Sequence, residues 1–279
     1  MIMDVPIKKR NLIFTKAPKA ILILMLAICW LSENILAEPK PVMGNNAHNE
    51  QKIQRIFERG QWLLSQIHKD MNGLDEAIEL FNRVIEMDSD NKDVYWKLSE
   101  IFFKKAEAAP DKEKRMELFK KSLSLARKAL ELDPDSVEPH FCIGGSSAKI
   151  AEMTWAVSAL LVIREALKEF KAAIKLDPNH RFSIISGAAL ASIYSEAPWP
   201  LNDLEDAEKY AKEAVKKDPN LAFACTVLAS VYAKRNKFKE AHLEIARCLS
   251  LKQPTYIWDA ELYNWPAAKR LLKEIEGRE

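Results

Sequence analysis

Residue types that could perform chemistry are scattered along this sequence rather than gathered in a motif. His140 and Cys142 form the only close His/Cys pair, and their spacing has no established metal geometry, so packing is the favoured role. The sequence holds no Gly-rich phosphate loop, no His-Glu-x-x-His, no Cys-x-x-Cys and no Gly-x-Ser-x-Gly. We therefore expect no catalytic residue, no metal and no cofactor.

Three cysteines, Cys142, Cys225 and Cys248, follow the N-terminal segment described below. An odd number without Cys-x-x-Cys spacing is not a disulfide framework, so buried small side chains are the favoured role. Cys225 and Cys248 fall on neighbouring predicted helices, and a bridge between them is an open alternative.

Apolar and aromatic residues are the remaining candidates, for binding rather than catalysis. The stretch 153–163 is nearly uncharged and too short to cross a membrane, so it forms either core, which is favoured, or the wall of an apolar cleft. A predicted loop holds Trp199 between two prolines, where it either meets a ligand or partner or plugs the helix ends. The candidate ligand or partner surface consists of Trp155, Leu161, Tyr194, Trp199 and Trp258.

The elements that must position these residues are helices. Among 279 residues there are only 7 Gly, and helix formers such as Ala, Leu, Lys and Glu dominate, which leaves little room for the tight turns of an all-β fold. The 42 Lys and Arg residues nearly balance the 40 Asp and Glu residues, so the chain has no basic footprint for nucleic acid. We expect an all-α fold and no nucleic-acid partner.

The N-terminal residues 1–37 have the layout of a signal peptide. Five basic residues precede the apolar run 20–31, and a polar stretch leads from this run toward the small Ala37. As a helix the run spans roughly 18 Å, against roughly 30 Å of bilayer hydrocarbon, so it is too short to cross. Cleavage after Ala37 is favoured, which makes residues 38–50 a polar linker. A retained anchor, or lipidation at Cys29 in a poor lipoprotein box, are the alternatives, and only these bring the chain into contact with a membrane.

A repeated helix signature runs through the rest of the chain. The segment 225–248 fits the tetratricopeptide pattern of large, Leu, small, Tyr, Ala, apolar and small residues at 34-residue spacing. The second-helix part of this pattern recurs four more times, and each of these copies ends in Asp followed by Pro or Ser. The four copies begin at Ala77, Ser122, Ala166 and Ala207.

These repeats predict a right-handed α-solenoid over residues 51–279, because each antiparallel helix pair needs its neighbours to bury its apolar face. We expect about five tetratricopeptide-like helix pairs and a C-terminal capping helix, with the best-formed pair at 221–234 and 238–251. The repeat ends are spaced by 45, 44, 41 and 34 residues, so the three middle repeats are lengthened. Such additions lengthen helices or connections on one side of the stack.

Three segments carry a resemblance to known families, namely residues 127–134, 194–200 and 267–272. With the lengthened third repeat, they resemble the regulator-of-microtubule-dynamics proteins and the T-component proteins found beside TRAP-type periplasmic transporters. The resemblance implies an all-helical tetratricopeptide-like domain and suggests no catalytic residue. For the T-components it also implies a periplasmic, often lipid-anchored protein with an apolar passage that partners a solute-binding protein.

These observations together favour an exported protein of the periplasm or cell envelope that binds rather than catalyses. Its expected partner is another protein, namely a periplasmic solute-binding or transport protein, and an apolar small molecule is an expected ligand. One alternative is a general scaffold for assembly of the cell envelope. The other is an enzyme whose acid/base groups lie in the concave cleft, which would need a pair of titratable residues with displaced pKa values there.

Overall fold

The computed structural model describes residues 43–66 and 71–278, and the chain divides into two compact units between His48 and Asn49. The predictions for the signal peptide, including cleavage after Ala37 and lipidation at Cys29, lie outside the described residues. In the described part of the chain, no helix has the length and apolar content that a membrane span needs.

The polar stretch before residue 51 differs from its prediction as a linker, because a helix begins at Met43. The side chains from His48 to Glu50 are exposed on this helix. At positions 48–50 the polar residues therefore mark contact with solvent and not the absence of helix.

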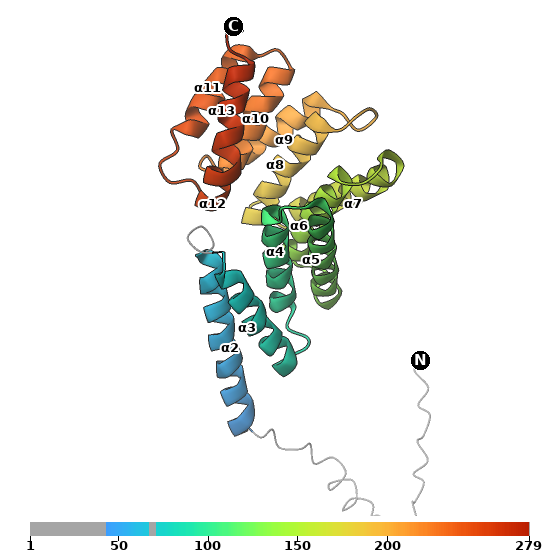
Figure 1. Cartoon of the computed structure of the whole chain (residues 1–279), viewed down its shortest axis with the longest axis vertical. Coiled ribbons are helices and arrows are strands. Elements are labelled where there is room, and N and C mark those ends of the chain that lie inside the picture. Colours follow the sequence, from blue (N-terminus) through green and yellow to red (C-terminus); the bar gives the residue numbers. More distant parts are fainter. Residues whose placement is uncertain (1–42, 67–70, 279) are drawn as a thin grey trace, which may run out of the picture. The chain divides into compact units, whose positions relative to one another are not determined.

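Every regular element in the described residues is helical, and ten of the helices form five antiparallel pairs. The pairs are α2 (Met43–Ser65) with α3 (Gly73–Met87), α4 (Lys92–Ala108) with α5 (Lys112–Leu132), α6 (Val137–Glu152) with α7 (Ala156–Leu176), α8 (Arg181–Glu196) with α9 (Leu204–Lys217), and α10 (Ala222–Lys234) with α11 (Phe238–Leu249). Each pair packs against the next along the chain, as Figure 1 shows for the coloured helices. The predicted all-α solenoid of about five tetratricopeptide-like pairs is confirmed.

Three further elements follow the last pair, namely α12 (Ile257–Asp259), the π-helical turn η1 (Ala260–Asn264) and α13 (Trp265–Glu274). Helix α13 packs on α10 and α11 and so forms the predicted C-terminal cap. The pair predicted at 221–234 and 238–251 matches α10 and α11 to within two residues.

Aspartates end the second helices of the first four pairs and shape the turns that follow. Asp88, Asp133, Asp177 and Asp218 each donate a backbone N–H to the carbonyl four residues earlier. Each carboxylate then accepts the backbone N–H two residues ahead, at distances between 2.9 and 3.3 Å. These local hydrogen bonds replace helical ones at the helix end and direct the chain into the next pair.

In two of the pairs, glycine sets how closely the two helices of the pair approach each other. A Cβ on Gly60 of α2 would lie 2.6 Å from the ring of Phe81 on α3, and one on Gly144 of α6 would lie 2.7 Å from the ring of Phe170 on α7. Both phenylalanines are buried. In the fourth pair, where the second helix has alanine instead, a Cβ on Gly187 would meet nothing closer than 3.8 Å. At these two positions the buried phenylalanine therefore leaves room only for glycine on the facing first helix.

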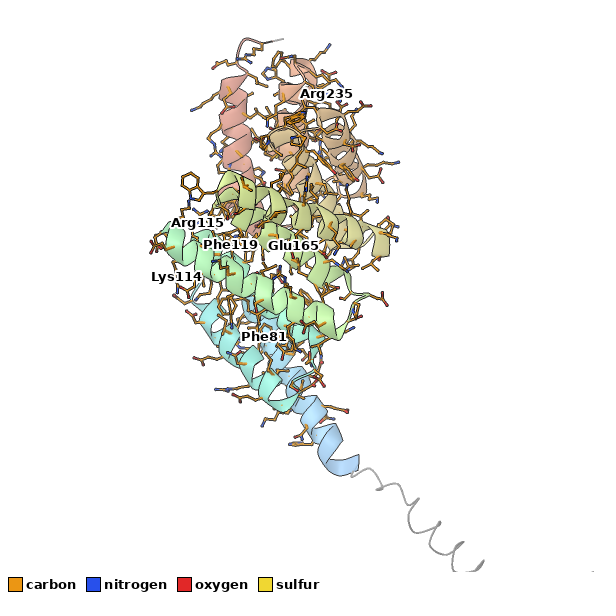
Figure 2. All side chains as sticks on the ribbon, turned by 90° about the vertical axis from the view of Figure 1, so that its right-hand side faces the viewer. Phe81, Lys114, Arg115, Phe119, Glu165 and Arg235 are labelled. Carbon is orange, nitrogen blue, oxygen red and sulfur yellow. The ribbon has the colours of Figure 1, made fainter. Side chains whose placement is uncertain are left out.

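The middle repeats are lengthened in two different ways. The second helices α5 and α7 each have 21 residues, whereas α11 has 12. In the fourth pair the connection 197–203 is long instead. Figure 2 shows polar side chains such as Lys114 of α5 projecting from the outer side of these helices. The opposite, inner face carries the candidate site. It is formed by the first helix of each pair, namely α2, α4, α6, α8 and α10.

Candidate functional site

The segment after α11 folds back over the inner face, and we call its residues 255–264 the strap. Its start is held at the α9–α10 turn, where the Thr255 hydroxyl donates to the Asp218 carboxylate at 2.7 Å and the Thr255 N–H donates to the Asn220 carbonyl at 3.1 Å. Its middle reaches α4, where Lys104 Nζ lies 2.7 Å from Asp259 Oδ1. The strap thus joins residues 155 positions apart in sequence and covers part of the inner face.

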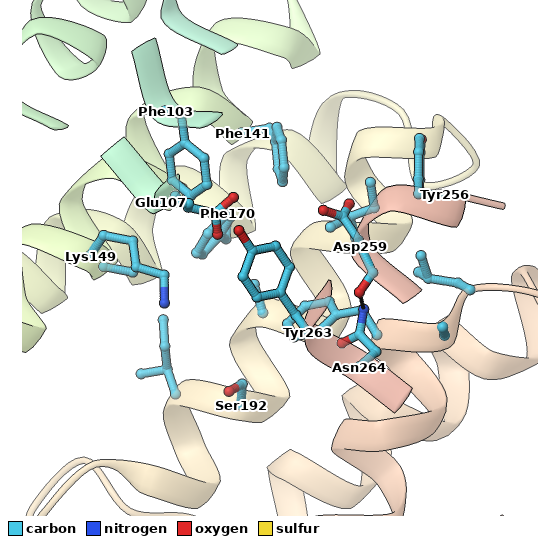
Figure 3. Close-up of a pocket in the computed structure, with 18 of the residues that line it drawn as sticks. Phe103, Glu107, Phe141, Lys149, Phe170, Ser192, Tyr256, Asp259, Tyr263 and Asn264 are labelled. Atoms are coloured by element: carbon cyan, nitrogen blue, oxygen red, sulfur yellow. Dashed lines mark hydrogen bonds between the residues drawn. The ribbon is translucent and has the colours of Figure 1, made fainter. Parts of the chain in front are cut away.

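A cavity of about 330 Å³, which we call the aromatic cavity, lies beneath the strap. Helices α4, α6, α8 and α10 each contribute residues to its wall, and the strap completes it. Six aromatic side chains line this cavity: Phe103, Phe141, Phe170, Phe223, Tyr256 and Tyr263. In Figure 3 the Tyr263 ring reaches into the cavity with its hydroxyl toward Glu107. Mostly apolar walls with a few polar groups are typical of sites for small organic ligands.

A second cavity of about 410 Å³ adjoins the first on the side of α2. Lys104 and Asp259 line both cavities, so the two meet at the contact between the strap and α4. The second cavity also has Lys97, Arg181 and Trp258 in its wall. Its lining is more basic than that of the aromatic cavity.

Two carboxylates share one ammonium group where the two cavities meet. Lys104 Nζ lies 2.7 Å from Asp259 Oδ1 and 3.3 Å from Glu107 Oε2, and we call these three residues the Lys104 cluster. The side chains of Lys104 and Glu107 are 15% and 17% exposed. Buried charges of this kind interact strongly because little water screens them.

The cluster displaces the pKa values of two of its members. Burial would lower the pKa of Lys104, but the charges of Glu107 and Asp259 outweigh burial and raise it. Burial raises the pKa of Glu107, and the nearby Lys104 only partly opposes this. Lys104 is therefore held in its charged form, whereas Glu107 is a carboxylate whose ionisation the protein disfavours.

A second buried carboxylate, Glu208 on α9, has the opposite surroundings. Its side chain is 7% exposed and contacts three cations, with Lys237 Nζ and Arg235 Nη1 lying 2.7 and 2.8 Å from Oε2, and Lys212 donating to Oε1. Burial would raise the pKa of Glu208, but hydrogen bonds from Lys212 and Lys237 outweigh it and lower the pKa. We call these four residues the Glu208 cluster. It ties α9 to the α10–α11 turn and lines none of the cavities described above.

The histidine and cysteines pack as the sequence predicts. His140 Nδ1 lies 2.5 Å from Glu169 Oε2, which joins α6 to α7. Cys142, Cys225 and Cys248 are buried free thiols, so the alternative of a Cys225–Cys248 bridge is not what the structure has. Among the described residues, no group of three or more His, Cys, Asp or Glu side chains could hold a metal ion.

Three of the five predicted surface residues lie away from both cavities. Trp155, Leu161 and Trp199 are strongly exposed, the first two at the start of α7 and the third in the α8–α9 connection. The favoured prediction that residues 153–163 are core is therefore wrong for this part of α7. Val162 and Ile163 pack inward, but Val157 and Leu161 share the opposite face of the helix, which is exposed.

The other two predicted residues, Tyr194 and Trp258, do not lie on this exposed surface. Tyr194 does not lie on a binding surface, because it is 8% exposed and its ring stacks on Tyr210 at 6.0 Å between ring centroids. It follows Leu190 by one turn on the face of α8 that packs into the core. Trp258 lies in the strap, where it lines the second cavity and packs against the core of the first two pairs.

Sequence reasoning missed most of the cavity wall. Phe103, Lys104, Phe141 and Tyr263 were not among the candidates, although α4 carries a readable signal. Four charged residues recur at helical spacing on α4 and therefore share one face of the helix. The repeat signature does not use this face, which carries Lys97, Glu100, Lys104 and Glu107. A charged face that the repeat signature does not explain, on the first helix of a pair, is the sequence signal for the inner wall.

Comparison with protein families supports the same fold. The family model described as regulator of microtubule dynamics protein 1-3 matches residues 63–187, which is less than half of the chain. This stretch runs from the end of α2 into α8 and includes part of the wall of both cavities. No curated protein gives a significant match.

Two solved structures show the fold. A thermophilic tetratricopeptide protein of Thermus thermophilus superposes with a TM-score of 0.59 at 15% identity, over 77% of this chain and 98% of that one. PilF of Pseudomonas aeruginosa superposes with a TM-score of 0.55 at 12% identity, over 82% of this chain and 92% of that one. The chain therefore has the tetratricopeptide-repeat fold.

Proposed function

We propose that this chain is an exported, non-enzymatic scaffold that holds a small, largely apolar ligand in the aromatic cavity. It works beside a second protein of the periplasm, namely a solute-binding or transport protein. The signal-peptide layout of residues 1–37 supports export. The resemblance to T-component proteins supports this kind of partner.

The observation that carries the ligand part of the proposal is the strap-covered cavity. An open solenoid offers a curved groove, whereas here a separate segment crosses the groove and partly covers a pocket of about 330 Å³ lined by six aromatic side chains. A partly covered, mostly apolar pocket of this size suits a small ligand that is largely removed from water. Binding of a partner protein alone would not require a segment to cross the groove.

The partner is expected at the exposed edge formed by the α6–α7 and α8–α9 connections. Trp155 and Trp199 occupy these two connections, and Val157 and Leu161 extend the apolar surface along α7. Leu201 of the second connection and Ile163 of α7 both pack on the same core cluster. Exposed tryptophan side chains are frequent anchors in protein interfaces.

The ligand is tested on full-length chain isolated from its own cell envelope and examined by native mass spectrometry. We expect an added mass that organic extraction releases. The variant Ala148→Phe places a ring in the cavity and should lose the added mass, whereas Trp199→Ala at the exposed edge should keep it. Absence of any added mass, with none taken up from an envelope lipid extract, would contradict the proposal.

The partner and the export are tested separately. Pull-down from periplasmic extract should recover a solute-binding or transport protein with the native chain but not with Trp155→Ala/Trp199→Ala, while Ala148→Phe still recovers it. N-terminal sequencing should begin at Glu38. A blocked terminus at Cys29 would make the protein lipid-anchored, and an intact Met1 would contradict cleavage. Recovery of envelope-assembly proteins instead would favour the general scaffold.

The enzymatic alternative rests on the displaced pKa values in the Lys104 cluster. Lys104 is held charged between two carboxylates and so cannot accept a proton, which leaves the two carboxylates; of these, Glu107 is the one whose pKa is raised. A proton-transfer role would make turnover depend on Glu107, whereas in a scaffold Glu107→Gln alters binding and stability and there is no turnover to lose. Incubation with envelope extracts and analysis for chemically changed products distinguishes the two.

A further inference from the structure

We infer that the ligand of the aromatic cavity carries a positive charge, as an organic ammonium or guanidinium group on an apolar or aromatic body. The inference rests on the proposed function, because it names the ligand class for the same cavity. Its basis is the unequal number of carboxylates and cations in the cavity wall, together with the aromatic rings around them.

The Lys104 cluster lacks one positive charge. Asp259 and Glu107 both face Lys104 Nζ, at 2.7 and 3.3 Å, and both line the aromatic cavity. One ammonium group balances one carboxylate, so with both carboxylates ionised the cluster has an excess negative charge, shared between the largely buried Glu107 and the partly exposed Asp259. A second cation in the cavity would restore the balance that buried charges require.

The other cation of this wall has its own partner. Lys149 on α6 donates to both carboxylate oxygens of Glu152 at 3.1 Å. Its charge lowers the pKa of Glu107 somewhat, but less than burial raises it. The pair of Lys149 and Glu152 is neutral as a whole, so the excess negative charge of the Lys104 cluster persists.

The aromatic rings favour the same class of ligand. A cation is attracted to the face of an aromatic ring, and this attraction is stronger where water is excluded. Figure 3 shows the Phe103 and Tyr263 rings beside Glu107, so a cation that meets the carboxylate also lies against these rings. A carboxylate ligand would instead face Glu107 and would have to displace Asp259 from Lys104 or Glu152 from Lys149.

The second cavity has the reverse balance and is not where we place the cation. Lys97, Lys104 and Arg181 line it, against the two carboxylates Glu100 and Asp259. The preference for a cation thus belongs to the aromatic cavity, and Glu107, which lines only that cavity, is the residue that sets it.

The test uses three probes of one shape, phenylbutylamine, phenylbutanol and phenylbutyrate, titrated into the full chain at neutral pH by isothermal calorimetry. We expect the amine to bind about tenfold more tightly than the alcohol, as one hydrogen-bonded charge contact implies, and the acid to bind most weakly. Equal affinity for all three, or preference for the acid, would overturn the inference and leave the proposed ligand site standing. Absence of binding by all three would contradict the proposed function as well.

Variants assign the preference to the cluster. Glu107→Gln and Asp259→Asn should each reduce the affinity for the amine to about that for the alcohol. Glu152→Gln removes the same charge from the rim of the same cavity and should keep at least part of the amine preference, because it leaves the cluster intact. An unchanged preference in both cluster variants, with native circular dichroism, would overturn the inference.

Discussion

The Lys104 cluster and the Glu208 cluster are two buried groups of charges with opposite composition. Glu208 has three cations around one carboxylate, and the surplus cations are partly exposed to water, which solvates them. The Lys104 cluster has two carboxylates around one cation; Lys104 and Glu107 are largely buried, whereas Asp259 is about as exposed as Arg235 and Lys237. A surplus that water can reach is compatible with a purely structural joint. In the Lys104 cluster the surplus charge instead borders the aromatic cavity, where a cationic ligand can balance it.

The largest expected effect of a single change in either cluster comes from Lys104→Met. Without the ammonium, two carboxylates face each other with no cation between them, and the free energy of unfolding should fall by about 3–5 kcal/mol. Urea unfolding followed by circular dichroism measures this. The control Lys114→Met, on a strongly exposed lysine of α5, should change it by less than about 1 kcal/mol. Similar losses of stability in both variants would contradict a specific stabilising role of Lys104 between the two carboxylates.

Glu208→Gln should be less costly, because the three cations left behind are partly solvated. We expect the free energy of unfolding to fall by about 1.5–3 kcal/mol, as for loss of hydrogen bonds to a charged group. Phenylbutylamine affinity per folded molecule should not change. A weaker affinity would show that the two clusters are coupled. It would contradict the distinction between a structural Glu208 cluster and a ligand-binding Lys104 cluster.

Glu107→Gln should act in the opposite direction on stability. Burial disfavours the charged form of Glu107, so a neutral side chain of the same shape should raise the melting temperature slightly while the preference for the amine is lost. Thermal scans with and without phenylbutylamine measure both quantities. A lower melting temperature would mean that Glu107 stabilises the fold and is not held there at a cost to stability.

The pH dependence of stability should also distinguish the two clusters, with a smaller effect than the substitutions above. The pKa of Glu107 is raised from 4.5, so its destabilising effect develops as the pH rises through that raised value, and the gain from Glu107→Gln should vanish at acidic pH. The pKa of Glu208 is lowered from 4.5, so its stabilising effect is complete above 4.5 and is lost as the pH falls through the lowered value. Melting temperatures of both variants and the native chain across this range check the two signs.

The repeat architecture could be predicted from the sequence because its signals are local. The small residues from Ala77 to Ala241 and the Asp endings recur at nearly the same offsets, and each describes contacts within one helix pair or with the next. The bounds of α10 and α11 follow from this pattern almost to the residue.

The site could not be predicted in the same way, because its residues come together through the strap. Nothing in the spacing of Lys104 and Asp259 indicates that they meet, since they lie in different repeats and neither belongs to the repeat signature. The exposed residues Trp155, Val157 and Leu161 show the converse, because an apolar sequence does not reveal which face of a helix the neighbouring helices leave open.

The strap also affects the order in which the chain can fold. Contacts between adjacent helices form over short sequence separations, so the repeats can fold as they emerge from synthesis or export. The contact of Lys104 with Asp259 spans 155 residues and has to wait for the last part of the chain. Until then the groove is open, so a ligand that is already present can be enclosed as the strap docks. Refolding in the presence of ligand should therefore load the cavity faster than adding the same ligand to folded protein.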